Sequence, residues 1–230
     1  MQIQYDGIKH TYRSPAGEPR TVLDIPEWSL QPGEQVLLRG VSGSGKTTLF
    51  NITAGLMRPT EGKVCFGEQS LYALPEAARD KFRSRNVGYI FQNHYLVNAL
   101  TALENVEMPM AFVNDMPRKK RRAIASEVLA KVGLADHIHY RPEQMSTGQR
   151  LRVGIARALA NNPAVLLADE PTAALDPENA AQAMELIQES CKQNNAILIV
   201  SSHDPAITPR FERIANLDNG KLSIEERQTT

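Results

Sequence analysis

The sequence predicts an α/β fold: a parallel β-sheet with helices on both faces, a β-rich segment before it and a helical insertion within it. Short apolar runs typical of buried parallel strands occur at 36–38, 164–168 and 197–200, and apolar residues with helical spacing separate them. This alternation of strands and helices favours a parallel sheet covered on both sides. A chain of 230 residues, 42% hydrophobic and 23% charged, suffices for one soluble domain with a subdomain.

The first forty residues have the pattern of short strands joined by turns. Ile3 and Tyr5 alternate with polar neighbours, which is the period of a half-buried strand. Segments 14–17 (Ser-Pro-Ala-Gly) and 31–34 (Gln-Pro-Gly-Glu) have the composition of turns. Further strands are predicted at 64–66 and 87–91.

The middle of the chain, about residues 95–160, is predicted to be a mainly helical subdomain. One helix begins at Pro117 and ends at Gly133, and its apolar face recurs every four residues at Ile124, Val128 and Val132. A second helix has the same spacing at Leu151, Ile155 and Leu159.

The α/β core resumes after this insertion. A helix opening at Asp176-Pro177 carries one apolar face, formed by Ala180, Met184, Ile187 and Cys191. Residues 213–217 predict a strand, followed by a hairpin turn at 218–221. We therefore expect a single domain in which about 1–94 and 161–230 form the core and about 95–160 the helical subdomain.

Composition excludes several classes of protein. Lys plus Arg equals Asp plus Glu at 26 each, so there is no basic excess, and no nucleic-acid partner is expected. No apolar run reaches the roughly 18–20 residues that span a bilayer, and the N-terminus lacks the features of a secretory signal. Cys65 and Cys191 sit among apolar neighbours and are predicted to be small buried hydrophobes, not a disulfide or a metal pair.

Residues 40–48 (Gly-Val-Ser-Gly-Ser-Gly-Lys-Thr-Thr) match the phosphate-binding loop pattern G-x-x-x-x-G-K-[ST]. Glycines let the backbone turn tightly and aim its N–H groups at an anion, and the dipole of the following helix would face the phosphates. Lys46 can reach β- and γ-phosphates, and the Thr47 hydroxyl can hold Mg²⁺. The sequence therefore predicts a P-loop NTPase core with nucleotide contacts from Gly40, Ser42, Gly43, Ser44, Gly45, Lys46, Thr47 and Thr48.

Two carboxylates, Asp169 and Glu170, follow the buried run 164–168. At the end of a buried strand they are costly unless a cation lies nearby, and in a P-loop fold the nucleotide binds at that end. Asp169 is predicted to bind Mg²⁺, directly or through water, and Glu170 to orient or deprotonate the attacking water. His203 follows the run 197–200 and could donate to a γ-phosphate, although a lone loop histidine is more often a surface or packing residue.

With these motifs in order, the chain resembles an ATP-binding cassette (ABC) ATPase over about residues 2–224. Gln92 matches the family's glutamine loop, which contacts Mg²⁺ or water and leads to the membrane partner. Residues 145–150 (Met-Ser-Thr-Gly-Gln-Arg) resemble the family signature LSGGQ, and 166–171 resemble its second nucleotide motif. Residues 174–176 match the loop that crosses the dimer interface.

The resemblance also bears on two single residues. His203 matches the family's switch histidine, which favours the functional interpretation of that residue. Tyr12 lies where the family places an aromatic ring against adenine, although the residues alone show only a strand aromatic.

The resemblance implies ATP and Mg²⁺ as ligands and two cassettes, most simply two identical chains, that face each other head to tail. Each ATP would be held by the P-loop of one chain and the signature of the other. This assigns nucleotide contacts to Ser146, Thr147, Gly148, Gln149 and Asp176.

The signature departs from LSGGQ at Met145 and Thr147. The first change is an apolar swap of similar volume. Because threonine would be strained at positive φ, we expect residue 147 to have an ordinary backbone conformation.

Residues 67–71, 79–92 and 100–106 resemble the branch that contains lipoprotein-releasing, macrolide-exporting and cell-division ATPases. The expected function is ATP hydrolysis coupled to a separate integral membrane permease, at the cytoplasmic face of the inner or plasma membrane. The alternative is a regulatory or soluble ABC ATPase that moves no cargo.

Two further segments allow competing interpretations. Tyr95, Leu96, Val97 and Leu100 are candidates for contact with the permease, or for burial in the helical subdomain. The five cations at 118–122 are either a solvated helix start or a contact for anionic lipid headgroups.

Overall fold

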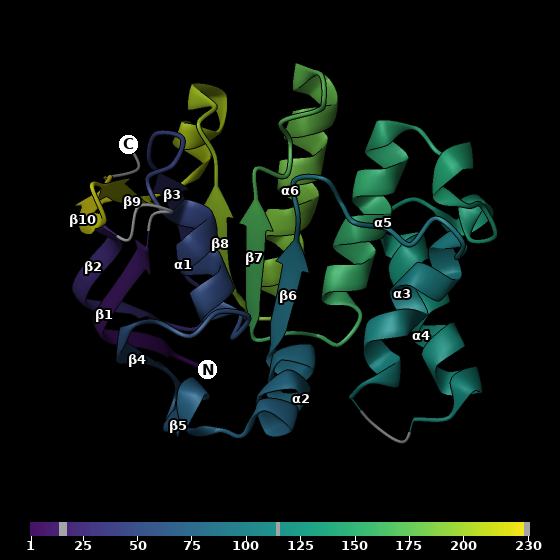
Figure 1. Ribbon diagram of the computed structural model, residues 1–230. Coiled ribbons are helices and arrows are strands. Elements are labelled where there is room, and N and C mark those ends of the chain that lie inside the picture. Colours follow the sequence, from purple (N-terminus) through teal and green to yellow (C-terminus); the bar gives the residue numbers. More distant parts are fainter. Residues whose placement is uncertain (14–17, 114–115, 228–230) are drawn as a thin grey trace.

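The computed structural model describes residues 1–13, 18–113 and 116–227, and these form two sheets and a group of helices (Figure 1). The turn expected at 14–17 lies outside the described residues. The smaller, antiparallel sheet has the order β2-β1-β4-β5. Its strands are β1 (Ile3–Arg13), β2 (Pro19–Leu30), β4 (Glu61–Phe66) and β5 (Gln69–Ser70).

The larger sheet has six strands in the order β10-β9-β3-β8-β7-β6, all parallel except β10. The turn between β9 and β10 has positive φ at Asn219 and Gly220, as a two-residue Asn-Gly hairpin requires. The strands are β3 (Gln35–Arg39), β6 (Val87–Ile90), β7 (Val165–Asp169), β8 (Ile197–Ser201), β9 (Arg213–Asp218) and β10 (Lys221–Glu226).

Helices cover both faces of the larger sheet, as predicted. Alternate residues of β7 belong to different hydrophobic clusters: Val165 and Leu167 to the one that contains α1, and Leu166 and Ala168 to the one that contains α5 and α6. Figure 1 shows α1 and α6 on opposite faces of this sheet and α3, α4 and α5 grouped beyond β6. The helices are α1 (Lys46–Thr53), α2 (Glu76–Asn86), α3 (Ala102–Ala111), α4 (Arg118–Lys131), α5 (Thr147–Leu159) and α6 (Pro177–Gln193).

Short 3₁₀ turns complete the described structure at Leu71–Ala73, Ala135–His137, Pro142–Gln144 and Pro205–Arg210. One hydrophobic cluster runs continuously from α3, α4 and α5 to α6 and the sheet. The subdomain boundaries near residues 94 and 160 stay a prediction. Among the described residues, no helix has both the length and the apolar character needed to cross a membrane.

Several local predictions need correction. Of the predicted face, Val132 is buried, while Ile124 and Val128 lie only partly buried against the core; the fully buried residues within α4 are Ala125 and Leu129. Alanine is easily overlooked as a core residue because its side chain is small, yet the same small side chain allows α4 to pack closely. Cys65 is half-buried on β4, not buried, because its partners on the same strand, Val64 and Phe66, take the inward positions.

The cation run opens α4 as a largely solvated turn. Arg118, Lys119, Lys120 and Arg122 are exposed, and half-buried Arg121 donates through Nη1 to the carbonyl of Met116 (2.6 Å). This matches the first of the two interpretations, and contact with lipid stays a prediction.

Candidate active site

A cavity of about 620 Å³ opens at the carboxyl ends of β3 and β7, beside the N-terminus of α1. It brings together residues from six separate parts of the sequence, and most of the predicted site residues are among them. It is lined by Tyr12, Arg20, Val22, Val41, Ser42, Gly43, Gly45, Lys46, Thr47, Thr48, Gln92, Asp169, Glu170 and His203.

The loop between β3 and α1 has a backbone that only glycine can supply at two positions. Gly45, the N-cap of α1, has φ 107°, and a Cβ there would lie 2.7 Å from the carbonyl oxygen of Val22. Gly43 has φ 76°. Among the described residues, no side chain caps α1, so its first N–H groups are available to an anion in the cavity.

Lys46, the first residue of α1, folds back over this loop. Its Nζ donates to the carbonyls of Gly40 (2.6 Å) and Val41 (3.2 Å). The ammonium is therefore held at the mouth of the loop. Ser44 is buried, and its Oγ has no hydrogen-bond partner among the described residues.

Asp169, the last residue of β7, is held by hydroxyl groups on both of its oxygens. Thr47 Oγ1 donates to Oδ2 (3.0 Å), and Ser201 Oγ donates to Oδ1 (2.5 Å). A hydroxyl and a carboxylate oxygen at this separation are hard ligands that suit Mg²⁺, which commonly takes one or two protein carboxylates and completes its shell with phosphate and water. Among the described residues, no group of three or more His, Cys, Asp or Glu side chains is arranged so that it could hold a metal ion by itself.

Ser201 is a member of the site that sequence reasoning missed. It is fully buried at the end of β8 and also accepts from the backbone N–H of Glu170 (3.1 Å). The available signal was a hydroxyl closing the apolar run 197–200, but the pairing of Asp169 with Ser201 across β7 and β8 requires the sheet order.

Glu170 occupies a strained backbone position. Its φ is 46°, in the left-handed region that non-glycine residues rarely adopt, and its N–H donates to the carbonyl of Ser201 (3.0 Å). Its Oε1 lies 2.9 Å from His203 Nδ1. The side chain of Glu170 is 13% exposed, against 75% for His203, so the carboxylate is sheltered and the imidazole faces solvent.

Gln92 and Tyr12 lie at the edges of the cavity. Gln92 is exposed two residues beyond the end of β6, which stops at Ile90, one residue short of the predicted strand. The hydroxyl of Tyr12 lies 3.3 Å from Thr48 Oγ1 and donates to Met57 Sδ (3.3 Å). The rings of Tyr12 and His10 meet edge-on at 4.7 Å, and Tyr12 is 41% exposed. Arg20 also lines the cavity, and no motif singled it out.

The signature residues lie elsewhere: none of Ser146, Thr147, Gly148, Gln149 or Asp176 lines this cavity. Ser146 is the N-cap of α5 and forms a capping box with Gln149, each side chain accepting the other's backbone N–H (3.2 and 2.9 Å). Thr147 is the first helical residue and has no positive φ, as expected.

Asp176 has a defined structural position at the start of α6. It is the N-cap of this helix, as the sequence predicted, and its Oδ1 accepts from the N–H of Asn179 (3.0 Å). The hydrogen bonds from the backbone and side chain of Asn179 hold the pKa of Asp176 below its usual value.

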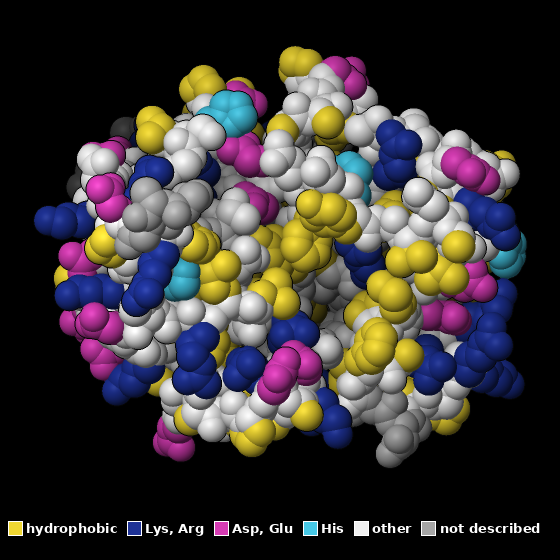
Figure 2. Space-filling view, viewed as in Figure 1, with side chains coloured by type: hydrophobic (Ala, Val, Ile, Leu, Met, Phe, Trp, Pro, Cys, Tyr) yellow, Lys and Arg dark blue, Asp and Glu magenta, His cyan; other side chains and the backbone are white. Residues whose placement is uncertain are grey.

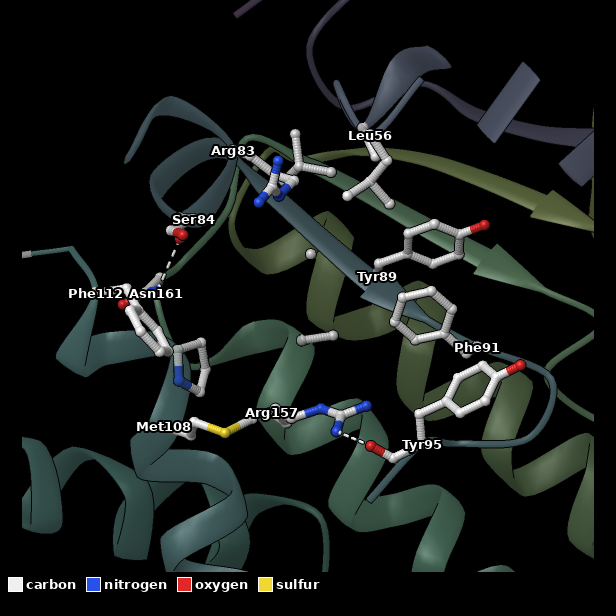
Figure 3. A pocket seen from close by; sticks show the side chains of 15 residues that line it. Leu56, Arg83, Ser84, Tyr89, Phe91, Tyr95, Met108, Phe112, Arg157 and Asn161 are labelled. Carbon is white, nitrogen blue, oxygen red and sulfur yellow. Dashed lines mark hydrogen bonds between the residues drawn. The ribbon is translucent and has the colours of Figure 1, made fainter. Parts of the chain in front are cut away.

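A second hollow, of about 330 Å³, lies between β6 and the helices α2, α3 and α5 (Figure 3). Its walls are mostly apolar, and the view in Figure 2 shows hydrophobic side chains gathered around a depression at the centre of this face. We call it the aromatic groove. Among its lining residues are Leu56, Tyr89, Phe91, Tyr95, Met108 and Phe112, with the cations Arg83 and Arg157.

The predicted permease contacts are only partly in this groove. Tyr95 lines it and is 63% exposed. Val97 is exposed outside the groove, while Leu96 and Leu100 are half-buried, and Leu96 packs against the helical core.

Comparison with known proteins agrees with this geometry. Residues 23–173 match the ABC transporter family. The chain is 40% identical over 223 residues to the lipoprotein-releasing system ATP-binding protein LolD of Chromohalobacter salexigens, which covers 97% of this chain and 93% of that protein. It is 39% identical to the macrolide export ATP-binding/permease protein MacB of Photorhabdus laumondii, with 96% of this chain covering 34% of that longer protein.

A solved structure has the same fold. The ATP-binding cassette MJ0796, in a dimeric post-hydrolysis state with ADP and Pi, superposes with a TM-score of 0.90 at 35% identity, covering 99% of this chain and 100% of that one. The chain therefore belongs to the ABC transporter family and is an ATP-binding cassette that hydrolyses ATP with Mg²⁺.

Proposed function

We propose that two copies of this chain close on two ATP molecules and that closure is transmitted to a separate membrane permease. The observation that carries this proposal is the division of the site. The cavity contains the P-loop and the acidic residues, whereas the capped N-terminus of α5, with its signature sequence, lies outside it. A second copy, placed head to tail, would supply that helix terminus to the open side of the cavity.

Within one chain, the P-loop would hold the triphosphate. The free N–H groups of α1 and the loop face the anion, and Lys46 would exchange its two carbonyl contacts for phosphate oxygens. Ser44 Oγ, without a partner among the described residues, is a further donor at the loop. The exposed ring of Tyr12, which lines the cavity, would stack on the base.

Thr47 and Asp169 would hold Mg²⁺, which neutralises charge on the phosphates when bound. Glu170 would accept a proton from the attacking water, because its carboxylate is sheltered and aimed by His203. His203 would bridge that carboxylate and the γ-phosphate, and Gln92 would orient the water or a metal ligand from the opposite edge.

Dimerisation would complete the site. Ser146, Thr147, Gly148 and Gln149 of each chain would contact the γ-phosphate held by the other, and Asp176 would lie at the interface. Because ATP would bind the closed pair more tightly than either open chain, binding shifts the population toward closure, and hydrolysis releases it.

The aromatic groove is the proposed docking place for the permease. A groove with apolar walls and exposed Tyr95 and Phe112 at its rim suits the apolar face of a short helix from a partner. The relatives include an ATP-binding protein of a lipoprotein-releasing system and an ATP-binding/permease protein for macrolide export. We accordingly place this chain at the cytoplasmic face of the inner or plasma membrane, attached through the permease.

The first experiment tests the divided site. Glu170→Gln should bind ATP, lose at least about a hundredfold in kcat, and accumulate as an ATP-bound dimer, measured by light scattering after gel filtration. Glu185→Gln, the same change at an exposed position of α6, should behave as wild type. A Glu170→Gln protein that stays monomeric with ATP and hydrolyses it at the normal rate would exclude the proposal.

The second experiment tests the groove. Phe112→Asp should abolish copurification with an integral membrane protein while leaving the ATPase activity of the isolated chain unchanged, because Phe112 lies outside the nucleotide cavity. Tyr140→Asp, a matched change at another exposed aromatic residue away from the groove, should keep the partner. Stimulation of hydrolysis by cargo in reconstituted vesicles then separates transport from a purely regulatory role.

A further inference from the structure

Arg157 makes an unusual set of contacts between the aromatic groove and the loop that follows Gln92. It projects from α5 into the groove, and its Nη1 donates to the carbonyl of Tyr95 (2.6 Å) (Figure 3). Its Nη2 donates to the carbonyl of His94 (2.5 Å). No carboxylate lies within ion-pair distance of it in the described chain. Burial lowers the pKa of Arg157, and the hydrogen bonds of this half-buried charge go to main-chain carbonyls.

The two residues that accept these bonds are both in a strained conformation. His94 has φ 58° and Tyr95 has φ 42°, although neither is glycine. Two consecutive left-handed residues persist only where the surroundings impose them. Besides main-chain hydrogen bonds from the N–H groups of His94 and Tyr95, the guanidinium fork binds both carbonyls at once with charge-assisted hydrogen bonds, which helps to impose this turn.

The strained turn separates the two hollows of the molecule. Gln92, two residues before His94, lines the nucleotide cavity, whereas Phe91 and Tyr95 on either side line the aromatic groove. The rings of Tyr89 and Phe91 stack at 4.0 Å, and Tyr95 meets Phe91 edge-on at 5.3 Å. Movement of this aromatic row would therefore move the backbone that carries Gln92.

Helix α5 provides a firm base for the contact. It lies so close to β6 that a Cβ on Gly88 would come within 2.4 Å of the carbonyl oxygen of Ala158. A Cβ on Gly154 would reach van der Waals distance, 3.9 Å, from His94 Cβ. The same helix begins at Ser146, so the signature and Arg157 are parts of one rigid element.

We propose that Arg157 is a positioning residue that clamps loop 93–95 in its left-handed turn and thereby sets the position of Gln92 at the nucleotide. A partner helix seated in the groove would touch both Tyr95 and the guanidinium, so it would reach Gln92 through this clamp. The inference rests on the role proposed above for Gln92, and it assigns the clamp to one side chain.

The test compares two arginines of α5 in the full-length chain. Arg157→Met should lower kcat about tenfold or more and leave the affinity for a fluorescent ATP analogue within about threefold of wild type, because the loop loses its position while the P-loop is intact. Arg152→Met is the matched control, since Arg152 also donates to a main-chain carbonyl, that of Val132, but away from the loop. Its kcat should stay near wild type.

A double-mutant cycle shows whether Arg157 acts through Gln92. Gln92→Ala combined with Arg157→Met should be no slower than Gln92→Ala alone, within about twofold. If the losses in kcat of the two single variants multiply in the double variant, the proposal that Arg157 acts through Gln92 is wrong. If the wild-type chain does not hydrolyse ATP, the proposed function is wrong, not the clamp. The comparison of wild type with Glu170→Gln detects that outcome independently of Arg157.

Two further readouts distinguish positioning from general stability. Hydrogen exchange in the peptide around 92–97 should accelerate in Arg157→Met, while exchange in 146–152 stays as in wild type. His94→Asn, a residue that tolerates left-handed φ, should restore part of the lost kcat in the Arg157→Met background. Unchanged exchange in 92–97, or no rescue, would contradict the proposal. If Arg157→Met does not fold, Arg157→Lys replaces it with the same expected results. Lysine keeps the charge but cannot bridge two carbonyls with a planar fork.

Discussion

Helices α1 and α5 both begin within a motif of glycine and polar residues, yet their N-termini differ in what satisfies their first N–H groups. The N-cap of α1 is Gly45, and no side chain bonds its first turn, which faces the cavity of its own chain. The N-cap of α5 is Ser146, whose side chain and that of Gln149 close a capping box outside any cavity shared with the P-loop. One terminus is open to a ligand, and the other is satisfied by its own residues.

The difference explains how one chain can carry two phosphate-binding elements without using both. An uncapped helix start is costly unless an anion binds there, so α1 is built around its ligand. A helix N-terminus closed by a capping box is stable without a ligand, so α5 remains folded until a second chain brings a phosphate to it. Four predictions test this contrast, from the largest expected effect to the smallest.

The largest effect is expected at the open terminus. Lys46→Ala removes the only lysine that lines the cavity in the described chain, and with it charge-assisted hydrogen bonds of about 1.5–3 kcal/mol each. ATP affinity should fall about a hundredfold or more, measured by calorimetric titration. Lys63→Ala, at an exposed lysine that pairs with Asp6, should bind ATP normally. Equal affinity in the Lys46→Ala protein would remove the role given to Lys46.

The second effect separates the two termini. Gly148 is helical and has no atom within 4 Å of an added Cβ, so Gly148→Ala should leave the monomer as stable as wild type or slightly more stable. In the Glu170→Gln background it should still bind ATP but weaken dimerisation about tenfold, since the new methyl group occupies the approach to the phosphate. Sedimentation velocity measures this. Gly154→Ala, in the same helix, should dimerise normally, and equal dimerisation of both variants would refute the two-chain site.

The third effect concerns the capping box itself. Ser146→Ala should cost about 1 kcal/mol of stability, or about 2–4 °C in Tm, because the N–H of Gln149 loses its acceptor. Thr101→Ala breaks the same kind of box in α3, formed with Glu104. Calorimetry should give both variants similar losses, and only Ser146→Ala should also impair ATP-driven dimerisation. A dimer defect in both would mean that stability alone explains it.

The smallest effect is a difference in pH dependence between the two boxes. Hydrogen bonds from the backbone and hydroxyl of Thr101 hold the pKa of Glu104 below its usual value. A carboxyl with a lowered pKa stabilises the fold above its ordinary pKa of about 4.3, and this contribution is lost as pH falls through the lowered value. Urea midpoints should show the Thr101→Ala penalty shrinking below about pH 4.3, while the Ser146→Ala penalty, which involves the uncharged Gln149, stays constant. Parallel behaviour of the two variants would contradict the assigned partners.

Much of the site could be predicted from sequence because its chemistry is local. The P-loop binds through consecutive backbone N–H groups, so the glycines and Lys46 stand within nine residues, and Asp169 and Glu170 are neighbours at the end of an apolar run. The left-handed φ of Glu170 and the hydroxyl of Ser201 were not predicted. Both depend on which strand lies beside β7, and the sheet order is a long-range property.

The aromatic groove was predicted only in part, because its members come from separated segments. Tyr95 could be suggested from its neighbours, but Leu56, Phe112 and Arg157 approach one another only once α2, α3 and α5 pack around β6. The buried stripe of α4 was only partly predicted for a similar reason, since Ala125 and Leu129 face the core together with the predicted Val132 by virtue of how α4 packs against α3 and α5.

By itself, the sequence determined the ligand class, the order of strands and helices and the residues that bind phosphate, because each depends on contacts between near neighbours in the chain. The tertiary structure alone decided that the signature helix stands outside the cavity of its own chain and that Arg157 holds the loop after Gln92. Those two facts depend on how α5 packs against β6, through residues as far apart in the sequence as Gly88 and Ala158.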